Sequence, residues 1–225
     1  MTTTRVPLER KVLSENDRLA SDLRTRFRDN GVFCLNLISS PGSGKTSLLE
    51  RTLGSFDPSR RVAVLTGDIQ TDCDAVRLGR FGFPVRQITT AGACHLDGRM
   101  IDRALEGWDL ANIDLLFIEN VGNLVCPTSY DLGEHAKVVT LSVTEGEEKP
   151  LKYPGIFFKA KLMLLNKIDL LPYVPFDKEL ARRNAETIHP GIEILELSCT
   201  TGQGVDAWLN WIEAAALSNT QAIGA

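Results

Sequence analysis

The sequence lacks a hydrophobic run long enough to span a membrane, since none approaches the roughly 20 apolar residues that a transmembrane helix needs. It also lacks a basic excess, because 25 lysines and arginines stand against 29 aspartates and glutamates, for a net charge of -4. Residues 1–11 are polar and contain no apolar signal-peptide core. These absences predict a cytoplasmic protein that acts on neither a membrane nor a nucleic acid.

Cysteine is scarce as well, with 5 residues in a chain of 225, so a disulfide framework is not expected. In a reducing cytosol, cysteines that gather in space more often serve metal or redox chemistry. Hydrophobic residues make up 43% of the chain, an ordinary share for a globular protein. The length is sufficient for one large α/β domain.

The chain begins with a helical pattern. Leu13 and Leu23 belong to its apolar face, Ser14 or Asp17 is the predicted cap, and residues 30–31 are the predicted end. Apolar runs typical of buried strands then alternate with further helical patterns. These runs are residues 32–38, 61–66, 84–88, 113–118, 137–143, 162–165 and 192–197.

This alternation predicts an α/β fold, a mostly parallel sheet with helices on both faces. The run at residues 84–88 begins with Pro84, which favours a place at the edge of the sheet. Ligands of such sheets bind beyond the carboxyl ends of the strands, and the polar motifs of this sequence follow the predicted strands.

The first of these motifs is a phosphate-binding loop between a strand and a helix. Gly42 and Gly44 leave room for backbone N–H groups to surround phosphate oxygens. Lys45 is placed to reach the β and γ phosphates, and the Thr46 hydroxyl to bind Mg²⁺. The usual pattern opens with glycine, where this chain has Ser39. The full run, with Ser43 and Ser47 as further nucleotide contacts, is Ser39–Ser40–Pro41–Gly42–Ser43–Gly44–Lys45–Thr46–Ser47.

A second motif, Asn166–Lys167–Ile168–Asp169, follows the predicted strand at residues 162–165. The Asp169 carboxylate would accept hydrogen bonds from the ring N–H and the exocyclic amine of guanine, a pair that adenine lacks. Lys167 would cover the base and Asn166 would brace the site. A weaker second base loop is Ser198–Cys199–Thr200, whose last two residues stand where many guanine-nucleotide proteins have Ala-Lys.

Acidic residues at two other strand ends are candidates for Mg²⁺ and the γ-phosphate. Glu119 would hold Mg²⁺ together with Thr46, and the N–H of Gly122 would contact the γ-phosphate. Asp68 is a second candidate for Mg²⁺ or for positioning the attacking water, and Asp72 is a weaker third. Because no glutamine is evidently placed to orient that water, we expect slow GTP hydrolysis.

Cys94, His95 and Cys126 each lie shortly beyond a strand end on the nucleotide side. Thiolate and imidazole groups bind Zn²⁺ or Ni²⁺, but three ligands leave a tetrahedral site one short. The alternative is that these are buried cysteines and an ordinary loop histidine.

With these motifs together, the sequence resembles the hydrogenase nickel-incorporation GTPases, the HypB family of dimerising phosphate-loop GTPases. The resemblance covers residues 13–216 and includes the loop that opens with Ser39. The motifs that carry it, besides the two nucleotide motifs, are Gly67–Asp68, Cys94–His95–Leu96–Asp97, Glu119–Asn120–Val121–Gly122–Asn123–Leu124–Val125–Cys126–Pro127 and Thr144–Glu145–Gly146–Glu147–Glu148–Lys149–Pro150–Leu151–Lys152–Tyr153–Pro154.

The resemblance implies a GTP-hydrolysing metallochaperone that helps insert nickel into NiFe hydrogenase. It implies a metal site of Cys94, His95 and Cys126 shared across a GTP-stabilised homodimer. Its implied partners are the nickel chaperone HypA and, directly or indirectly, the hydrogenase large subunit. The expected organisation is a packed N-terminal helix (1–31), a phosphate-loop GTPase domain (32–217) and a frayed tail (218–225).

Two departures from the family limit the metal chemistry that we expect. Residues 1–10 contain neither a cysteine-rich site nor a histidine-rich stretch, so tight nickel storage is not predicted there. Arg99 and Arg103 occupy helical positions where some members carry extra histidines, which argues against a second metal ion.

Three other functions fit the sequence less well. A urease accessory GTPase would carry Cys-Pro-His, where this chain has Cys126–Pro127–Thr128. A small-molecule phosphate-loop kinase would need a substrate lid and gives no reason for the motif ending at Asp169. A metal-binding module with a degenerate nucleotide site is disfavoured by the intact Lys45 and Thr46.

Overall fold

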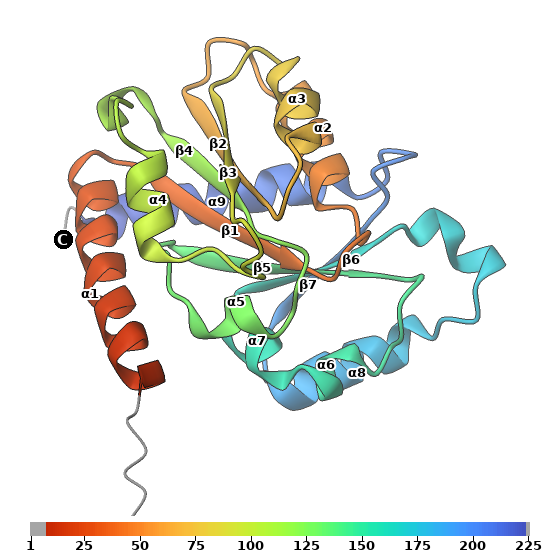
Figure 1. Ribbon diagram of the computed structural model, residues 1–225. Helices are drawn as coiled ribbons and strands as arrows, with labels where there is room; N and C mark the ends of the chain where they lie inside the picture. The colour runs from red at the N-terminus through yellow and green to blue at the C-terminus, as the bar shows by residue number, and fades with distance from the viewer. Residues whose placement is uncertain (1–7, 224–225) are drawn as a thin grey trace, which may run out of the picture.

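The structure, a computed structural model, describes residues 8–223 (Figure 1). The predictions for residues 1–7 and 224–225 lie outside the described residues. They include part of the prediction that residues 1–10 hold no cysteine-rich or histidine-rich nickel site. Between residues 8 and 223, no helix combines the length and the apolar character that crossing a bilayer requires.

A seven-stranded sheet forms the centre of the molecule, in the order β3-β2-β4-β1-β5-β6-β7. All of its strand pairs are parallel, which confirms the predicted sheet, and β3 lies at the edge as Pro84 indicated. The strands are β1 (Phe33–Ser39), β2 (Val62–Asp68), β3 (Val85–Thr89), β4 (Leu115–Glu119), β5 (Ala136–Ser142), β6 (Leu162–Asn166) and β7 (Glu193–Leu197).

Helices cover both faces of this sheet (Figure 1). One face packs against α2, α3 and α9, whereas the other packs against α1 and α4 at one end and against α7 and α8 at the other. The helices are α1 (Leu8–Asp29), α2 (Lys45–Ser55), α3 (Cys73–Gly79), α4 (Gly98–Ala104), α5 (Cys126–Ser129), α6 (Lys149–Lys152), α7 (Pro154–Lys159), α8 (Lys178–Ile188) and α9 (Val205–Ile223), with short 3-10 turns η1 (Leu110–Asn112) and η2 (Ile168–Tyr173).

The central strand β1 explains why both faces need a covering layer. Successive side chains of a strand point to opposite faces, so Leu35 and Leu37 pack toward α2 and α9 while Cys34 and Ile38 pack toward the other helices. All seven residues of β1 are buried. Because β1 pairs with β4 on one side and β5 on the other, the connections diverge here, and ligands of open parallel sheets bind at such a point.

Two predicted helix limits are wrong. Helix α1 begins at Leu8, so Ser14 and Asp17 lie inside it and neither is its cap. The residues just upstream are charged residues that favour helix and extend it. Helix α9 continues to Ile223, so residues 218–223 are helical where a frayed tail was predicted, since extending an established helix costs little.

A half-buried histidine directly before β5 leads to a pH prediction. His135 Nδ1 accepts a hydrogen bond of 3.0 Å from the Cys34 N–H. Burial, helped by the positive charge of Arg24, lowers the pKa of His135 from 6.5 to about 4. As the pH falls from 6.5 toward 4, His135 binds a proton in the unfolded chain but not in the folded chain. The free energy of unfolding is therefore at its full value above pH 6.5 and decreases over this range.

We expect this residue to remove about 1 kcal/mol from the free energy of unfolding between pH 7.5 and 5.5. In His135→Asn the side-chain oxygen can still accept the Cys34 hydrogen bond but does not titrate. Urea unfolding of both proteins at the two pH values should show the smaller loss in the variant. An equal loss in the two proteins would contradict the prediction.

Candidate functional site

The loop between β1 and α2 has the geometry of a phosphate cradle. Gly42 and Gly44 have φ values of 76° and 101°, in the left-handed region that favours glycine. A Cβ on Gly44 would lie 2.5 Å from Nδ2 of Asn166, so any side chain there would push the base-side motif away. Lys45 is the first residue of α2 and is 8% exposed. Its Nζ donates to Ser39 Oγ at 2.9 Å, and burial lowers its pKa.

Beside Lys45, the Thr46 hydroxyl of α2 meets the Glu119 carboxylate at the end of β4. Thr46 Oγ1 donates to Glu119 Oε1 at 2.7 Å. The other carboxylate oxygen, Oε2, is buried and has no hydrogen-bond partner. Burial raises the pKa of Glu119 to about 7, and the nearby charge of Lys45 only partly offsets this. A buried carboxylate oxygen without a partner beside a threonine hydroxyl fits a hard divalent cation such as Mg²⁺.

A cavity of about 440 Å³ joins these groups. The residues that line it include nine that were predicted from the sequence: Gly42, Gly44, Lys45, Thr46, Ser47, Asp68, Glu119, Gly122 and Lys167. Gly122 lies close against the loop, since a Cβ on it would be 3.0 Å from Cα of Pro41. Asp68 is folded into its own turn, where its Oδ1 accepts from the N–H groups of Gln70 and Thr71. Asp72 does not line this cavity, whereas Asp74, which the sequence analysis missed, does.

The base-side motif is tied to the phosphate loop. Asn166 Nδ2 donates to Ser43 O at 2.8 Å, and Lys167 Nζ donates to Gly42 O at 2.7 Å. Lys167 has a φ of 64°, an uncommon backbone conformation for a residue with a side chain. Asp169 Oδ1 is buried without a hydrogen-bond partner. An unpartnered acceptor at this place fits the paired N–H donors of guanine.

The second base loop is fixed differently. Ser198 is fully buried and its Oγ accepts from the Thr201 N–H, so it shapes the turn. Cys199 Sγ lies 3.6 Å from Asn166 Oδ1, and burial raises its pKa to about 11, so a neutral thiol stands in this loop. Arg51 of α2 donates to the carbonyl oxygens of both Cys199 and Thr200. No sequence motif had pointed to this arginine.

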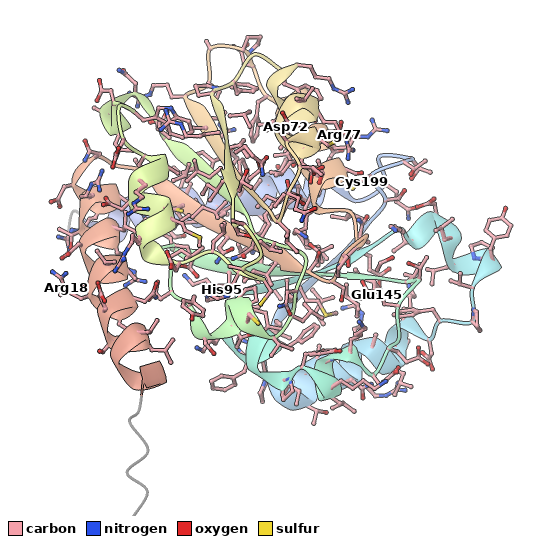
Figure 2. All side chains as sticks on the ribbon, in the orientation of Figure 1. Arg18, Asp72, Arg77, His95, Glu145 and Cys199 are labelled. Atoms are coloured by element: carbon pink, nitrogen blue, oxygen red, sulfur yellow. The ribbon has the colours of Figure 1, made fainter. Side chains whose placement is uncertain are left out.

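Glu145 and Lys149 also brace the phosphate loop, although no role was predicted for them. Glu145 Oε1 accepts from Ser43 Oγ at 2.6 Å, and Lys149 lies 3.2 Å from its Oε2 while donating to Ser40 Oγ at 3.1 Å. Figure 2 shows Glu145 near the loop after β5, away from Asp72 and Arg77 at α3. Their polar run follows the end of a strand, which is the signal that could have identified them.

The predicted metal ligands do come together. The ligand atoms of Cys94, His95 and Cys126 lie within 4.8 Å of one another. The two sulfur atoms are 2.7 Å apart, and the His95 ring stacks on Tyr130 with centroids 3.8 Å apart. The hydrogen bond to Cys126 raises the pKa of Cys94, and burial lowers that of His95. Figure 2 places His95 beside α5, near the carboxyl ends of the strands.

The N-terminal helix connects the two segments that carry these ligands. Asn16 of α1 is 4% exposed, and its Oδ1 accepts from the Gly98 N–H at 2.8 Å. Its Nδ2 donates to Asp131 O at 2.9 Å. Gly98 follows the Cys94–His95 loop and Asp131 follows α5, so one side chain fixes the spacing of both halves of the cluster.

Comparison with known proteins agrees with this arrangement. The family described as "CobW/HypB/UreG, nucleotide-binding domain" matches residues 34–196. A hydrogenase maturation factor HypB from Azotobacter vinelandii is 53% identical over 206 residues, covering 92% of this chain and 68% of the relative.

Two solved structures are also similar. The crystal structure of HypB from Helicobacter pylori in complex with nickel has a TM-score of 0.86 at 37% identity, covering 92% of this chain and 97% of that one. HypB from Archaeoglobus fulgidus gives a TM-score of 0.84 at 38% identity, covering 90% and 99%. Because both the family match and these relatives extend over most of its length, this chain belongs to the HypB family of hydrogenase maturation factors.

Proposed function

We propose that the protein is a GTP-hydrolysing nickel metallochaperone for NiFe hydrogenase, which binds Ni²⁺ at Cys94, His95 and Cys126. The observation that carries this proposal is that the cluster and the phosphate loop lie at the same end of the sheet, beyond the carboxyl ends of its strands. The resemblance to a HypB crystallised in complex with nickel supports Ni²⁺ as the cargo, and the same ligand types also suit Zn²⁺.

GTP would lie with its phosphates in the cavity beside Glu119 and with its base toward Asp169, which is not among the residues that line the cavity. The backbone amides of the glycine loop and the Lys45 ammonium would bind the β and γ phosphates, and the Asp169 carboxylate would read guanine. Thr46 and Glu119, with Asp68 nearby, would hold Mg²⁺, which supplies charge neutralisation for phosphoryl transfer. Gly122, which packs against Pro41 of the loop, would offer its N–H to the γ-phosphate.

Three ligands from one chain leave room for a second copy at the metal. In an isologous homodimer, Cys126 of each protomer could lie near the two-fold axis and complete a four-ligand site with Cys94 or His95. We further propose that GTP stabilises this dimer in the cytoplasm. The proposed partners are HypA, as the nickel source, and the hydrogenase large subunit, as the direct or indirect acceptor.

The test is the dependence of nickel affinity on the bound nucleotide. Cys126 follows Gly122 through only three residues, so a movement of Gly122 on hydrolysis must also move the Cys126 sulfur. We expect nickel titrations of the GTP-analogue and GDP forms to give different dissociation constants. Linkage then requires nickel to shift nucleotide-dependent dimerisation by the same free energy, which light scattering measures.

Cys126→Ala should weaken nickel binding by more than about 10-fold and remove its nucleotide dependence, while GTP binding to the monomer remains. Cys94→Ala should also weaken nickel binding, and His95→Ala should do so less if imidazole only tunes the geometry. Cys73→Ala is the matched control, because Cys73 is exposed on α3 outside the cluster. Equal nickel affinities and equal masses in both nucleotide states would reject a GTP-switched interfacial site.

A further inference from the structure

A row of hydrogen-bonded polar side chains runs from the end of β4 across β1 to the start of β5. Asn36 of β1 is fully buried and Asn120, directly after β4, is 1% exposed. Asn120 Nδ2 donates to Asn36 Oδ1 at 3.2 Å. Asn36 Nδ2 in turn donates to Glu134 Oε1 at 3.3 Å, and Lys137 forms an ion pair with the same carboxylate. Buried amides this well partnered have one defined orientation.

That orientation decides what the other end of Asn120 does. Because the Glu134 carboxylate can only accept, Asn36 must offer it the NH₂ group and present its oxygen to Asn120. Asn120 therefore turns its own oxygen toward two backbone N–H groups. Oδ1 accepts from Val121 N at 3.0 Å and from Leu96 N at 3.3 Å.

These two N–H groups belong to the two functional loops. Val121 immediately precedes Gly122, and Leu96 immediately follows the Cys94–His95 pair. The backbone of Asn120 is anchored separately, since its N–H donates to Leu37 O at 3.0 Å. One acceptor oxygen on a fixed backbone thus holds the nucleotide-sensing turn and the metal-binding loop together, and the side chain that carries it is almost fully buried.

We propose that Asn120 is the positioning residue that transmits the nucleotide state to the Cys94–His95 half of the metal site. This inference rests on the proposed GTP-linked nickel function. Cys126 follows the nucleotide turn through the chain itself, but Cys94 is 26 residues earlier than Asn120 and needs a noncovalent link. A second contact, from Asn123 Nδ2 to Cys94 O at 3.2 Å, supports the same loop from the same turn. Both halves of the site then move together.

The test compares nickel dissociation constants in the GTP-analogue and GDP forms of wild type, Asn120→Ala and Asn120→Asp. We expect the ratio of the two constants, typically 5- to 150-fold for coupled sites, to fall to about 1 in Asn120→Ala. Asn120→Asp, kept neutral by its burial and by the neighbouring Glu134 carboxylate, can donate its O–H to Asn36 Oδ1 and keeps an acceptor for the Leu96 N–H, so it should retain most of the ratio. The nickel–thiolate charge-transfer absorption should differ between nucleotide states in wild type and Asn120→Asp only.

Asn184→Ala is the matched control, because Asn184 also bridges two segments, donating to Glu147 O at 2.9 Å, away from the cluster. It should keep the wild-type ratio. A wild-type ratio in Asn120→Ala would overturn the inference and leave the proposed function standing. Equal affinities in both states of the wild type would instead reject the GTP-linked nickel function.

A metal-free measurement separates the two further and does not depend on the folding of a variant. Amide hydrogen exchange of the wild-type segment containing Leu96 should differ between the GTP-analogue and GDP forms without nickel. Unchanged exchange there, with altered exchange at residues 121–123, would show that the nucleotide signal does not reach the metal loop and would overturn the inference.

Discussion

Lys45→Ala should lower the rate of GTP hydrolysis by at least about 10²- to 10³-fold, the usual loss when one preorganised charge is removed from a transition state. Lys45 is the first residue of the helix that opens onto the nucleotide cavity, and its Nζ already lies near the loop, on Ser39 Oγ. Without Lys45, the negative charge on the transferring phosphoryl group would lose the ammonium group that stabilises it. Steady-state phosphate release measures the effect.

The fold should survive this substitution. Burial lowers the pKa of Lys45, so holding its charge in the folded protein costs free energy that alanine does not. Thermal unfolding of the nucleotide-free variant should stay within a few degrees of wild type. Lys178→Ala is the matched control, because Lys178 of α8 pairs with Glu196 of β7, outside the nucleotide cavity. Near-normal hydrolysis in Lys45→Ala would reject this loop as the phosphate site.

The sequence predicted the parts of the site in which local geometry and chemistry coincide. Glycines at left-handed positions and a lysine at a helix start are requirements within a few residues, so Gly42, Gly44 and Lys45 could be identified from the sequence. Cys94 and Cys126 are 32 residues apart, but both follow strands of a parallel sheet, whose carboxyl ends lie at the same end of the sheet. Their approach could therefore also be predicted.

Other contacts depend on tertiary packing that no local pattern records. Ser43 and Glu145 are 102 residues apart, and Arg51 and Cys199 are 148 apart. The role of Asn120 depends on which end of an amide faces which loop, and this is decided by Glu134 through a strand in between. The start of α1 was missed for a related reason, since Ser14 is a good cap by type but the helix continues upstream of it.

Asp169→Asn should exchange the base preference of the protein from guanine to xanthine. The unpartnered buried Oδ1 of Asp169 suits the ring N–H and the exocyclic amine of guanine, and an asparagine NH₂ would meet that amine with a second donor. Xanthine carries a carbonyl at the same position and would accept from the asparagine. Sites built on such hydrogen bonds discriminate by on the order of 10⁴-fold, so we expect the ratio of GTP to xanthosine triphosphate affinity to change by a factor of that order.

Competition of both nucleotides against a fluorescent GDP analogue measures this ratio in the two proteins. Hydrolysis of xanthosine triphosphate by Asp169→Asn should approach the wild-type rate with GTP, because Lys45, Thr46 and Glu119 line the proposed phosphate cavity, which Asp169 does not line, and are unchanged. Asp206→Asn, an equal change at an exposed position in the first turn of α9, should leave the preference for GTP intact. If Asp169→Asn still binds GTP in strong preference to xanthosine triphosphate, guanine is recognised by other groups, and the second base loop at Cys199 and Thr200 is then the place to look, since Arg51 holds its carbonyl oxygens beside the phosphate-loop helix.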